Sequence, residues 1–345
     1  MGTGNKYLTK AKDIKDDEFY TGYEDIKKEL INYAKYFRGK VIYCNCDDHN
    51  GIGLGTPKSN FLKYLADNFE AFKIKKVIAT HYEKDKDTST MYILDKDNTG
   101  DGIACFEDIA EIPMKGNGDF RSDECIELLK QADIVITNPP FSLFREYVTQ
   151  LMEYKKKFLI IGNKNALSYK DIFSLIKYNK VWLGYNSPSD FTYKGEPTKK
   201  ITGLTRWFTN IENSKRNEKL NTGKKYYGYE EMYPKYDNYD AINVDKVNDI
   251  PMDYYGVMGV PITFLDKYNP EQFEITGITK TWFGGASKIY PKQIQIDKNG
   301  NRKEVSKLND GATLEVNQIN NQTYYEVAGK KYIQLYARIL IKRKQ

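Results

Sequence analysis

The sequence predicts an α/β fold in which helices cover both faces of a parallel, doubly wound sheet. In the first half of the chain, short apolar runs typical of buried strands alternate with segments whose apolar residues recur every three or four positions, as in amphipathic helices. Strands that alternate with helices favour a parallel sheet. The 345 residues, of which 40% are hydrophobic, are enough for one large domain or two modest ones.

The predicted elements of this half follow one another in a regular order. Strands are expected at residues 41–44, 77–80, 134–136, 158–161 and 181–183. Helices are expected at residues 24–36, 60–69, 123–130, 143–152 and 171–177. Ser59 is a suitable N-cap for the second helix, because its hydroxyl can accept a backbone N–H bond. The polar stretch 83–102 is expected to form a surface hairpin.

The pattern changes near residue 185. From there to about residue 280 the chain is rich in Tyr, Asn, Lys and Gly, and its periodicity is weaker. Basic residues interleave with aromatic ones here, which fits a nucleic-acid surface and fits an ordinary polar loop region equally well. Residues 286–335 are predicted to form β-hairpins, with Asn299-Gly300 as a turn. Residues 332–341 are predicted to form a strong strand before a basic tail.

Composition limits the compartment and the partners. The net charge of +6 and the pI of about 8.7 permit a phosphate-rich partner without requiring one. No apolar run is long enough to span a membrane, and the N-terminus has no hydrophobic signal core, so we expect a cytoplasmic protein.

The four cysteines are Cys44, Cys46, Cys105 and Cys125. Cys44-Asn45-Cys46 has the form of half a metal site, but no matching Cys or His pair exists in the sequence. We therefore expect no metal and no disulfide in this chain.

The most informative stretch is the turn 137–141, with the sequence Thr-Asn-Pro-Pro-Phe. It follows an apolar strand and precedes an amphipathic helix, a context in which amino-methyltransferases hold a planar amine against S-adenosylmethionine. The Asn138 side-chain oxygen and the backbone carbonyl of Pro139 are acceptors suited to the hydrogens of such an amine. Pro139 and Pro140 stiffen the turn, and Phe141 offers a face on which an extruded base can stack. The structural alternative is a proline-rich turn with no chemistry.

Further segments match this turn in order along the chain. They are Asp-Glu-Phe-Tyr-Thr at 17–21, Cys-Asn-Cys-Asp-Asp at 44–48, Gly-Asp-Phe-Arg-Ser at 118–122 and Thr-Asn-Pro-Pro-Phe-Ser-Leu-Phe-Arg at 137–145. Together they resemble the EcoRI-type DNA adenine-specific (N6) methyltransferase family. Later stretches extend the resemblance over roughly residues 5–278, at 158–163, 207–210, 233–243, 256–264 and 269–273.

The resemblance implies a Rossmann-like S-adenosylmethionine-dependent methyltransferase sheet with a C-terminal target-recognition region. We expect a catalytic, cofactor-binding domain at residues 1–184 and a DNA-recognition region at 185–280. A β-rich extension at 281–345 would end in a strand that returns to the core. The implied reaction methylates the exocyclic amine of a flipped adenine in double-stranded DNA. A cognate restriction endonuclease is an implied partner, and a monomer suffices for the reaction.

Three residues are implied to contact the nucleoside part of the cofactor. Asp119 would bind the adenine amine of the cofactor, and Phe120 would pack on that ring. Asp119 has an alternative role as a helix cap, which Ser122 could also fill. Glu83 would accept hydrogen bonds from the two ribose hydroxyls, since it closely follows a strand.

The remaining cofactor contacts lie nearer the N-terminus. Asp47 or Asp48 would lie near the methionine part of the cofactor, with a plain turn after the strand as the alternative. Phe19, Tyr20 and Thr21 resemble the family's N-terminal cofactor motif that closes over the site, and an N-terminal packing segment is their alternative.

The chain departs from the family at two places. Residues 49–56 form a glycine-rich insertion after the Asp-Asp pair, which leaves the choice between Asp47 and Asp48 open. The part after residue 280 is longer than in the family.

Two other functions fit the sequence less well. One is methylation of another planar amine, such as cytosine, RNA or a protein glutamine. The other is a non-catalytic DNA-binding protein on the same scaffold. The family's best-known recognition site, GAATTC, is a candidate DNA sequence here.

Overall fold

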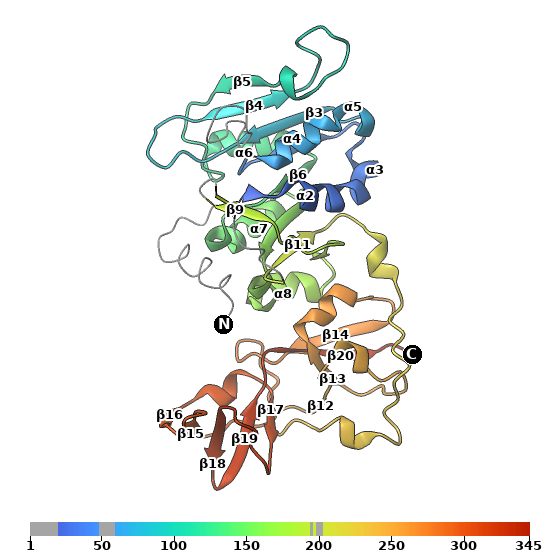
Figure 1. Cartoon of the computed structure of the whole chain (residues 1–345), viewed down its shortest axis with the longest axis vertical. Coiled ribbons are helices and arrows are strands. Elements are labelled where there is room, and N and C mark those ends of the chain that lie inside the picture. Colours follow the sequence, from blue (N-terminus) through green and yellow to red (C-terminus); the bar gives the residue numbers. More distant parts are fainter. Residues whose placement is uncertain (1–19, 48–58, 194–195, 198–202) are drawn as a thin grey trace. The chain divides into compact units, whose positions relative to one another are not determined.

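The computed structural model describes residues 20–47, 59–193, 196–197 and 203–345 (Figure 1). Contacts divide the chain into two compact units, the first formed by residues 1–166 with 180–213 and the second by 167–179 with 214–345. The chain finally leaves the first unit at residue 213 rather than at 184, because residues 182–209 supply the last two strands at one end of the first unit's sheet.

An eight-stranded sheet forms the centre of the first unit, in the order β5-β4-β3-β2-β6-β7-β11-β8. Its strands are β2 (Val41–Cys44), β3 (Lys76–Thr80), β4 (Thr90–Leu94), β5 (Ala110–Pro113), β6 (Ile134–Thr137), β7 (Lys157–Asn163), β8 (Trp182–Leu183) and β11 (Thr205–Thr209). The four central strands β3, β2, β6 and β7 are parallel, as predicted. The outer strands join through antiparallel pairs, so the sheet as a whole is mixed.

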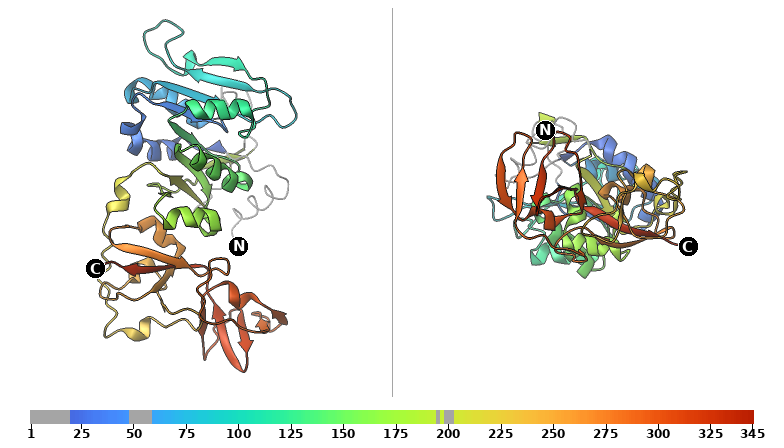
Figure 2. Two further views of the ribbon diagram at one scale, coloured as in Figure 1. Left: turned by 180° about the vertical axis from the view of Figure 1, so that it is seen from behind. Right: turned by 90° about the horizontal axis from the view of Figure 1, so that it is seen from below.

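Helices lie on both faces of this sheet (Figures 1 and 2). They are α2 (Tyr23–Leu30), α3 (Ala34–Phe37), α4 (Asn60–Asp67) and α5 (Phe69–Phe72) on one face, and α6 (Asp123–Gln131) and α7 (Phe144–Glu153) on the other. Alternate strand residues face the two layers: Ile42 packs with the core of α2 and α4, whereas Phe208 contacts Phe144 of α7 with ring centroids 4.9 Å apart. The predicted doubly wound arrangement is therefore present.

Two predicted elements of the first unit differ in the structure. The helix expected at 24–36 is interrupted by a 3-10 turn, η1 (Ile31–Tyr33), between α2 and α3. The stretch 83–102 is not a surface hairpin: it contributes β4, whose Tyr92 and Leu94 are buried and extend the sheet. The strand was not predicted because the stretch is mostly polar and only two side chains of β4 are buried.

A small three-stranded sheet lies beside the main one. It consists of β1 (Tyr20–Thr21), β9 (Phe191–Tyr193) and β10 (Glu196–Pro197), in the order β1-β9-β10. β1 pairs antiparallel with β9 through Tyr20 and Thr21. This pairing joins the N-terminal segment to a part of the chain that is about 170 residues later.

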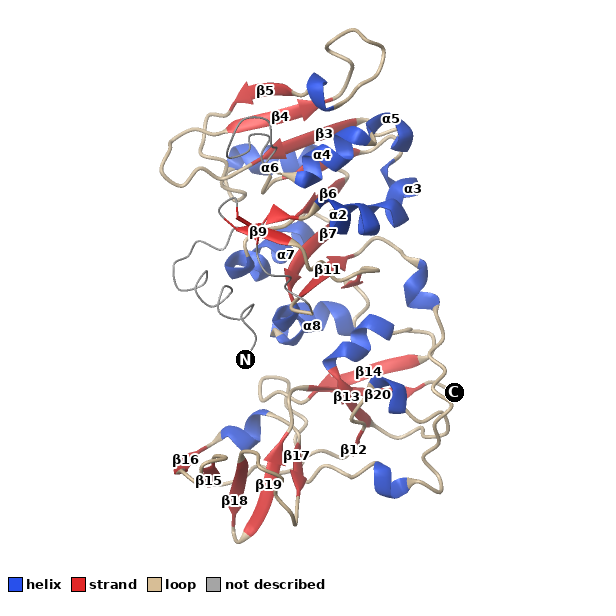
Figure 3. Ribbon diagram, in the orientation of Figure 1, coloured by secondary structure: helices blue, strands red, loops and turns tan. Residues whose placement is uncertain are grey.

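The second unit is drawn mainly as strands and loops in Figure 3. One sheet has the order β12-β13-β20-β14, and the other has the order β16-β15-β18-β19-β17. Their strands are β12 (Ile242–Asn243), β13 (Met258–Pro261), β14 (Phe273–Ile278), β15 (Gln293–Ile296), β16 (Arg302–Val305), β17 (Thr313–Glu315), β18 (Tyr324–Val327), β19 (Lys330–Gln334) and β20 (Arg338–Arg343).

Helix α8 (Lys170–Lys177) belongs to this unit although it precedes β8 in the sequence. Phe173 contacts Trp282 and Phe283 with ring centroids 5.9 Å apart, and Lys177 Nζ donates to the Ile275 carbonyl at 3.0 Å. These contacts explain why the helix belongs to the second unit rather than to the predicted catalytic domain.

The hairpins predicted at 286–335 are present, and Gly300 has φ +83° in the turn between β15 and β16. The single strand predicted at 332–341 is two strands, β19 and β20, in different sheets, and β20 lies inside the four-stranded sheet of the second unit. Short 3-10 turns complete the fold: η2 (Phe106–Asp108), η3 (Phe141–Leu143), η4 (Lys164–Ser168), η5 (Ser214–Asn217), η6 (Glu230–Met232), η7 (Val247–Asp249), η8 (Ile262–Lys267) and η9 (Lys307–Asp310).

Candidate active site

A cavity of about 230 Å³ lies in the first unit, where the parallel strands β2, β3 and β6 end. Ligands bind at this edge of open α/β sheets, because loops from neighbouring strands meet there. Its lining residues come from six segments of the chain: Tyr20, Thr21, Asn45, Cys46, Asp47, Ser59, Asn60, Phe61, His81, Tyr82, Glu83, Gly118, Asp119, Phe120, Arg121, Asn138, Pro140 and Leu143. The segments that the sequence singled out therefore converge on one cavity.

Asp47 ties three of these segments together. Its carboxylate accepts hydrogen bonds from Ser59 Oγ at 2.9 Å and from Thr137 Oγ1 at 2.7 Å, and its backbone N–H donates to the Thr80 carbonyl. Burial raises the pKa of Asp47 to about 7, although the two hydroxyl bonds act in the opposite direction. Asp47 thus connects β2, β6 and the start of α4 at the floor of the cavity.

Ser59 caps α4, as predicted. Its hydroxyl oxygen accepts from the Leu62 N–H at 3.2 Å and donates its own proton to Asp47. Asn60, the next residue, donates from Nδ2 to the Thr21 carbonyl at 2.7 Å. The N-terminus of α4 is therefore bonded both to the end of β2 and to β1.

The β1 strand brings Tyr20 and Thr21 to the cavity, as expected for the N-terminal motif. Thr21 is 2% exposed, and its Oγ1 has no hydrogen-bond partner among the residues that the structure describes. Phe19 and Asp48 lie outside the described residues, as does the insertion 49–56.

Helix α2 holds the segment that supports β1. The Asp25 carboxylate accepts from the N–H groups of Ser189 and Asp190 at 2.6 and 2.8 Å. The buried Glu29 carboxylate accepts from the N–H groups of Tyr185 and Asn186 at 2.7 and 2.8 Å. Because Asp190 directly precedes β9, these bonds fix the strand on which β1 pairs.

Glu83 lies in the loop after β3. One of its oxygens, Oε1, accepts from His81 Nε2 at 3.0 Å and from Lys86 Nζ at 3.1 Å. The hydrogen bond with His81 is the main reason why the pKa of Glu83 is lowered, so the carboxylate stays ionised near neutral pH. A charged acceptor therefore faces the cavity at the position where the ribose contact was predicted.

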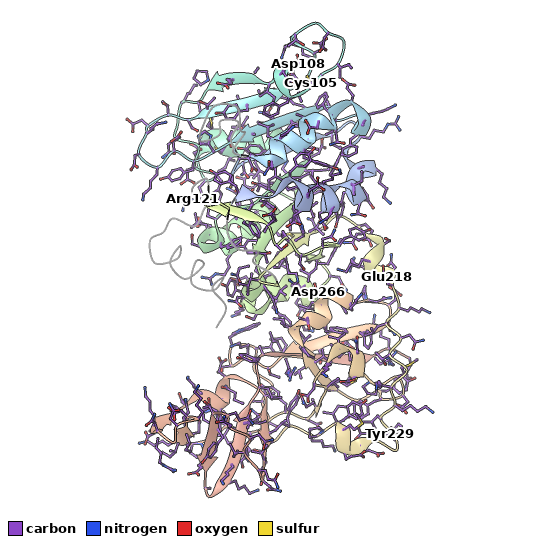
Figure 4. The ribbon with its side chains drawn as sticks, viewed as in Figure 1. Cys105, Asp108, Arg121, Glu218, Tyr229 and Asp266 are labelled. Carbon is purple, nitrogen blue, oxygen red and sulfur yellow. The ribbon has the colours of Figure 1, made fainter. Side chains whose placement is uncertain are left out.

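Asp119 is held by Arg121 in a bidentate ion pair, with Nε at 2.9 Å and a terminal nitrogen at 2.7 Å. This bond lowers the pKa of Asp119. The Ser122 hydroxyl, not Asp119, caps α6 by accepting from the Cys125 N–H, which removes the cap role proposed as the alternative for Asp119. Arg121, labelled in Figure 4, also approaches Glu146 to 3.5 Å.

Gly118 shows how closely two of these loops approach. It has φ +80°, and a Cβ at this position would lie 1.9 Å from the His81 carbonyl oxygen. Only glycine fits this space and this conformation without strain. The loop that carries Asp119 is therefore packed directly on the loop that carries Glu83.

The turn after β6 places Asn138 and Pro140 on the cavity wall. Pro139 is buried, and Phe141 begins η3 and packs partly buried against the core on the α2 side of the sheet. The four residues of the predicted catalytic turn thus lie together, and two of them line the cavity.

Sequence reasoning missed several lining residues. Asn45 is 2% exposed and follows β2 directly, yet it stands inside the Cys-Asn-Cys run that drew attention to the cysteines. Arg121 and His81 bond to Asp119 and Glu83, each two residues away in the sequence, and were not recognised as their partners. The position of Asn45 immediately after a buried strand was a usable signal.

Two other features concern ligands and membranes. In the described part of the chain, no three His, Cys, Asp or Glu side chains gather in a way that could bind a metal ion, and none of the four cysteines there forms a disulfide. Cys105 and Asp108, both labelled in Figure 4, lie on the loop between β4 and β5. The Asp108 carboxylate accepts from the Asn98 and Thr99 N–H groups. Within the same described residues, no helix has the length and apolar character needed to cross a bilayer.

Comparison with known proteins links this geometry to a reaction. A family model described as adenine-specific methyltransferase EcoRI matches residues 7–344. The Type II methyltransferase M.EcoRI of Escherichia coli is 48% identical over 303 residues, which covers 80% of this chain and 90% of that protein.

Two mycoplasma proteins are also similar. The Type II methyltransferase M.MgeORF184P of Mycoplasma genitalium is 40% identical over 78% of this chain and 85% of its own length. The corresponding values for M.MpnI of Mycoplasma pneumoniae are 39%, 78% and 84%. No solved structure matches the chain significantly.

Proposed function

This chain belongs to the EcoRI-type adenine-specific methyltransferase family and is an adenine-specific DNA methyltransferase, and from that premise we propose how it acts. The methyl donor is S-adenosylmethionine, and the acceptor is the exocyclic amine of an adenine extruded from duplex DNA. The observation that carries this proposal is that Asn138 and Pro140 line the same cavity as Glu83, Asp119 and Thr21. A methyl donor in that cavity would lie next to the turn that holds the amine.

The residues of the cavity fit this cofactor. Two carboxylates, Glu83 and Asp119, suit the hydroxyl and amine donors of a nucleoside. Thr21 Oγ1 and Asn45 Nδ2 are buried at the cavity without hydrogen-bond partners in the described structure, as expected where a polar ligand completes the bonding.

Individual contacts follow from this fit. Asp119 would bind the cofactor's adenine amine through Oδ2, because Arg121 uses only one of the two lone pairs on that oxygen. Phe120, the next residue, is buried and lines the same cavity, and it would pack on the cofactor's adenine ring. Glu83 would accept from the ribose through Oε2, the oxygen that His81 and Lys86 leave free. Tyr20 and Thr21, which line the same cavity, would cover the bound cofactor.

Asp47 has a supporting role in this proposal. Both of its oxygens already accept bonds from Ser59 and Thr137, so it would shape the floor near the methionine part rather than bind it strongly. The choice between Asp47 and Asp48 as the direct contact stays a prediction.

The catalytic turn would act by positioning. The Asn138 side-chain oxygen and the Pro139 carbonyl would accept the two amine hydrogens and direct the nitrogen lone pair toward the methyl group, while Phe141 stacks on the flipped base. When bound, S-adenosylmethionine supplies a methyl group already activated by its sulfonium, so these residues need not include a strong base. Extrusion of the base should cost a few kcal/mol, which the pocket contacts offset.

The proposal extends to the partners. Duplex DNA would bind through salt-dependent phosphate contacts, and the part of the predicted recognition region that lies in the second unit, residues 214–280, would read the base edges, with GAATTC as the candidate site. The C-terminal strands after residue 281 would support that region. The enzyme would work in the bacterial cytoplasm as a monomer, beside an endonuclease that cuts the same site.

The test begins with purified protein, unmethylated genomic DNA and S-adenosylmethionine, followed by sequencing that reports modified bases. We expect methyladenine at one short motif. Asn138→Ala should abolish methylation while cofactor binding persists, and Asn32→Ala, which changes an exposed asparagine of the same unit, should leave both unchanged. Methylation by the Asn138→Ala variant would disprove the mechanism. Absence of cofactor binding by the unmodified protein would disprove the cofactor assignment.

A further inference from the structure

Asn45 is a buried amide whose two ends face different surroundings. It follows β2 directly, is 2% exposed and lines the cavity. Its Oδ1 accepts a hydrogen bond from the hydroxyl of Tyr147, on α7. Its Nδ2 has no hydrogen-bond partner among the described residues. A buried donor left in this state is costly unless a ligand supplies the acceptor.

Tyr147 determines which end of the amide faces the cavity. It is fully buried, and burial raises its pKa well above the usual value, so the hydroxyl keeps its proton and needs an acceptor. Asn45 Oδ1 is the acceptor that the structure describes for it. The rings of Phe120 and Tyr147 form a T-shaped pair with centroids 5.1 Å apart. The amide nitrogen of Asn45 is therefore directed away from Tyr147.

The other polar groups of the cavity indicate which atom of the ligand would accept a hydrogen bond from Asn45 Nδ2. Glu83 and Asp119 can accept bonds from the nucleoside part of the proposed cofactor. The carboxylate of its amino-acid part is an acceptor and needs donors. Arg121 is the arginine among the lining residues and is already bound to Asp119 and Glu146, and the described lining contains no lysine. Among the described lining residues, the donors that remain for the carboxylate are neutral.

We propose, on the basis of the proposed function, that Asn45 Nδ2 donates a hydrogen bond to the carboxylate of the cofactor's amino-acid part and that Tyr147 is the residue that positions it. Thr21 Oγ1, also buried and without a partner in the described structure, is another neutral donor at the cavity. Tyr147 lies only a few residues after the catalytic turn, so the same helix that follows Asn138 orients a cofactor contact.

The sharpest variant is Asn45→Asp, which is isosteric. It keeps an oxygen for the Tyr147 hydroxyl and replaces the Nδ2 donor by a second oxygen. In mildly alkaline buffer, where the new carboxyl group is ionised, it should repel the ligand's carboxylate.

Two ligands distinguish the loss of this one hydrogen bond from a general distortion of the cavity. S-adenosylhomocysteine carries the amino-acid part, whereas 5′-methylthioadenosine keeps the nucleoside and lacks that part. Isothermal titration calorimetry measures the affinity for each ligand. Asn45→Asp should weaken the binding of S-adenosylhomocysteine about tenfold to 100-fold and change the binding of 5′-methylthioadenosine less than about twofold.

A second pair of variants tests the positioning role. Tyr147→Phe removes only the hydroxyl that orients Asn45. It should weaken the binding of S-adenosylhomocysteine by about three- to tenfold without changing the binding of 5′-methylthioadenosine. Tyr64→Phe is the matched control: Tyr64 is 2% exposed in α4 and does not line the cavity. It should leave both affinities unchanged. Thermal unfolding of each variant verifies that it is folded.

Each result has a defined meaning. Weaker binding of S-adenosylhomocysteine with unchanged binding of 5′-methylthioadenosine supports the proposal. If Asn45→Asp does not fold, the same result for Tyr147→Phe is enough to support it. Equal loss of both ligands, or no loss of either, overturns it and leaves the proposed function intact. If the unmodified protein binds neither ligand, the proposed function fails with it.

Discussion

Thr137 and Asp47 are 90 residues apart in the sequence, and the Thr137 hydroxyl donates to the Asp47 carboxylate at 2.7 Å. Thr137 is the last residue of β6, directly before Asn138, and Asp47 lies just after β2 and lines the cavity. Both side chains are buried. The bond therefore links the strand that leads to the proposed catalytic turn with the floor of the proposed cofactor cavity.

This buried carboxylate should make stability depend on pH. Burial raises the folded-state pKa of Asp47 from an ordinary 3.8 to about 7. The folded protein therefore holds this proton more tightly than the unfolded chain does. The associated stabilisation is complete below about pH 4 and is lost as pH rises through 7, by up to about 4 kcal/mol at roughly 1.4 kcal/mol per pH unit.

Asp47→Asn removes this titration and nearly preserves shape. We expect the difference in unfolding free energy between the unmodified protein and Asp47→Asn to shift in favour of the variant between about pH 4 and 7, and to level off above that range. Denaturant unfolding at several pH values measures it. Parallel stability profiles for the two proteins would show that Asp47 does not titrate in this range.

How far the sequence predicts this site depends on the distance over which each contact acts. The Ser59 cap was predictable, because its partner Leu62 lies three residues away and capping follows a local rule. The parallel core was predictable from hydrophobic periodicity. The Asp47–Thr137 bond and the exposure of Asn45 to the cavity depend on loops that meet in three dimensions. The four-residue strand β5 was missed because three of its residues are exposed.

The Glu29 carboxylate should be a main support of the segment before β9. It is buried and accepts bonds from the N–H groups of Tyr185 and Asn186. Glu29→Ala would leave these groups without an acceptor and should destabilise the protein by about 3 kcal/mol. Glu24→Ala, which removes an exposed carboxylate from the same helix, should cost less than about 0.5 kcal/mol. Urea unfolding compares them, and equal effects would contradict the assigned role of Glu29.

Gly118 should be required for the shape of the cavity. Gly118→Ala places a Cβ 1.9 Å from the His81 carbonyl and also strains a φ of +80°. Gly100→Ala is the matched control, because Gly100 has φ +84° with nothing within 4 Å of the added Cβ. The control should show only the conformational cost of about 1 kcal/mol, whereas Gly118→Ala should also lose most S-adenosylhomocysteine binding. Similar binding by the two variants would show that the close approach to His81 does not matter.

Two variants distinguish a role of Glu83 in binding the ribose from its role as the ion-pair partner of Lys86. If Glu83 accepts from the ribose, Glu83→Gln should weaken S-adenosylhomocysteine about tenfold, because hydrogen bonds to a charged acceptor contribute roughly 1.5–3 kcal/mol. Lys86→Ala removes the exposed partner of Glu83, whose Nζ lies 3.1 Å from Oε1, and keeps the carboxylate. Exposed pairs contribute little, so this variant should bind within about twofold of the unmodified protein. Calorimetric titration of both distinguishes the roles: an equal loss in the two variants would mean that the pair with Lys86, rather than the carboxylate itself, supports the cavity.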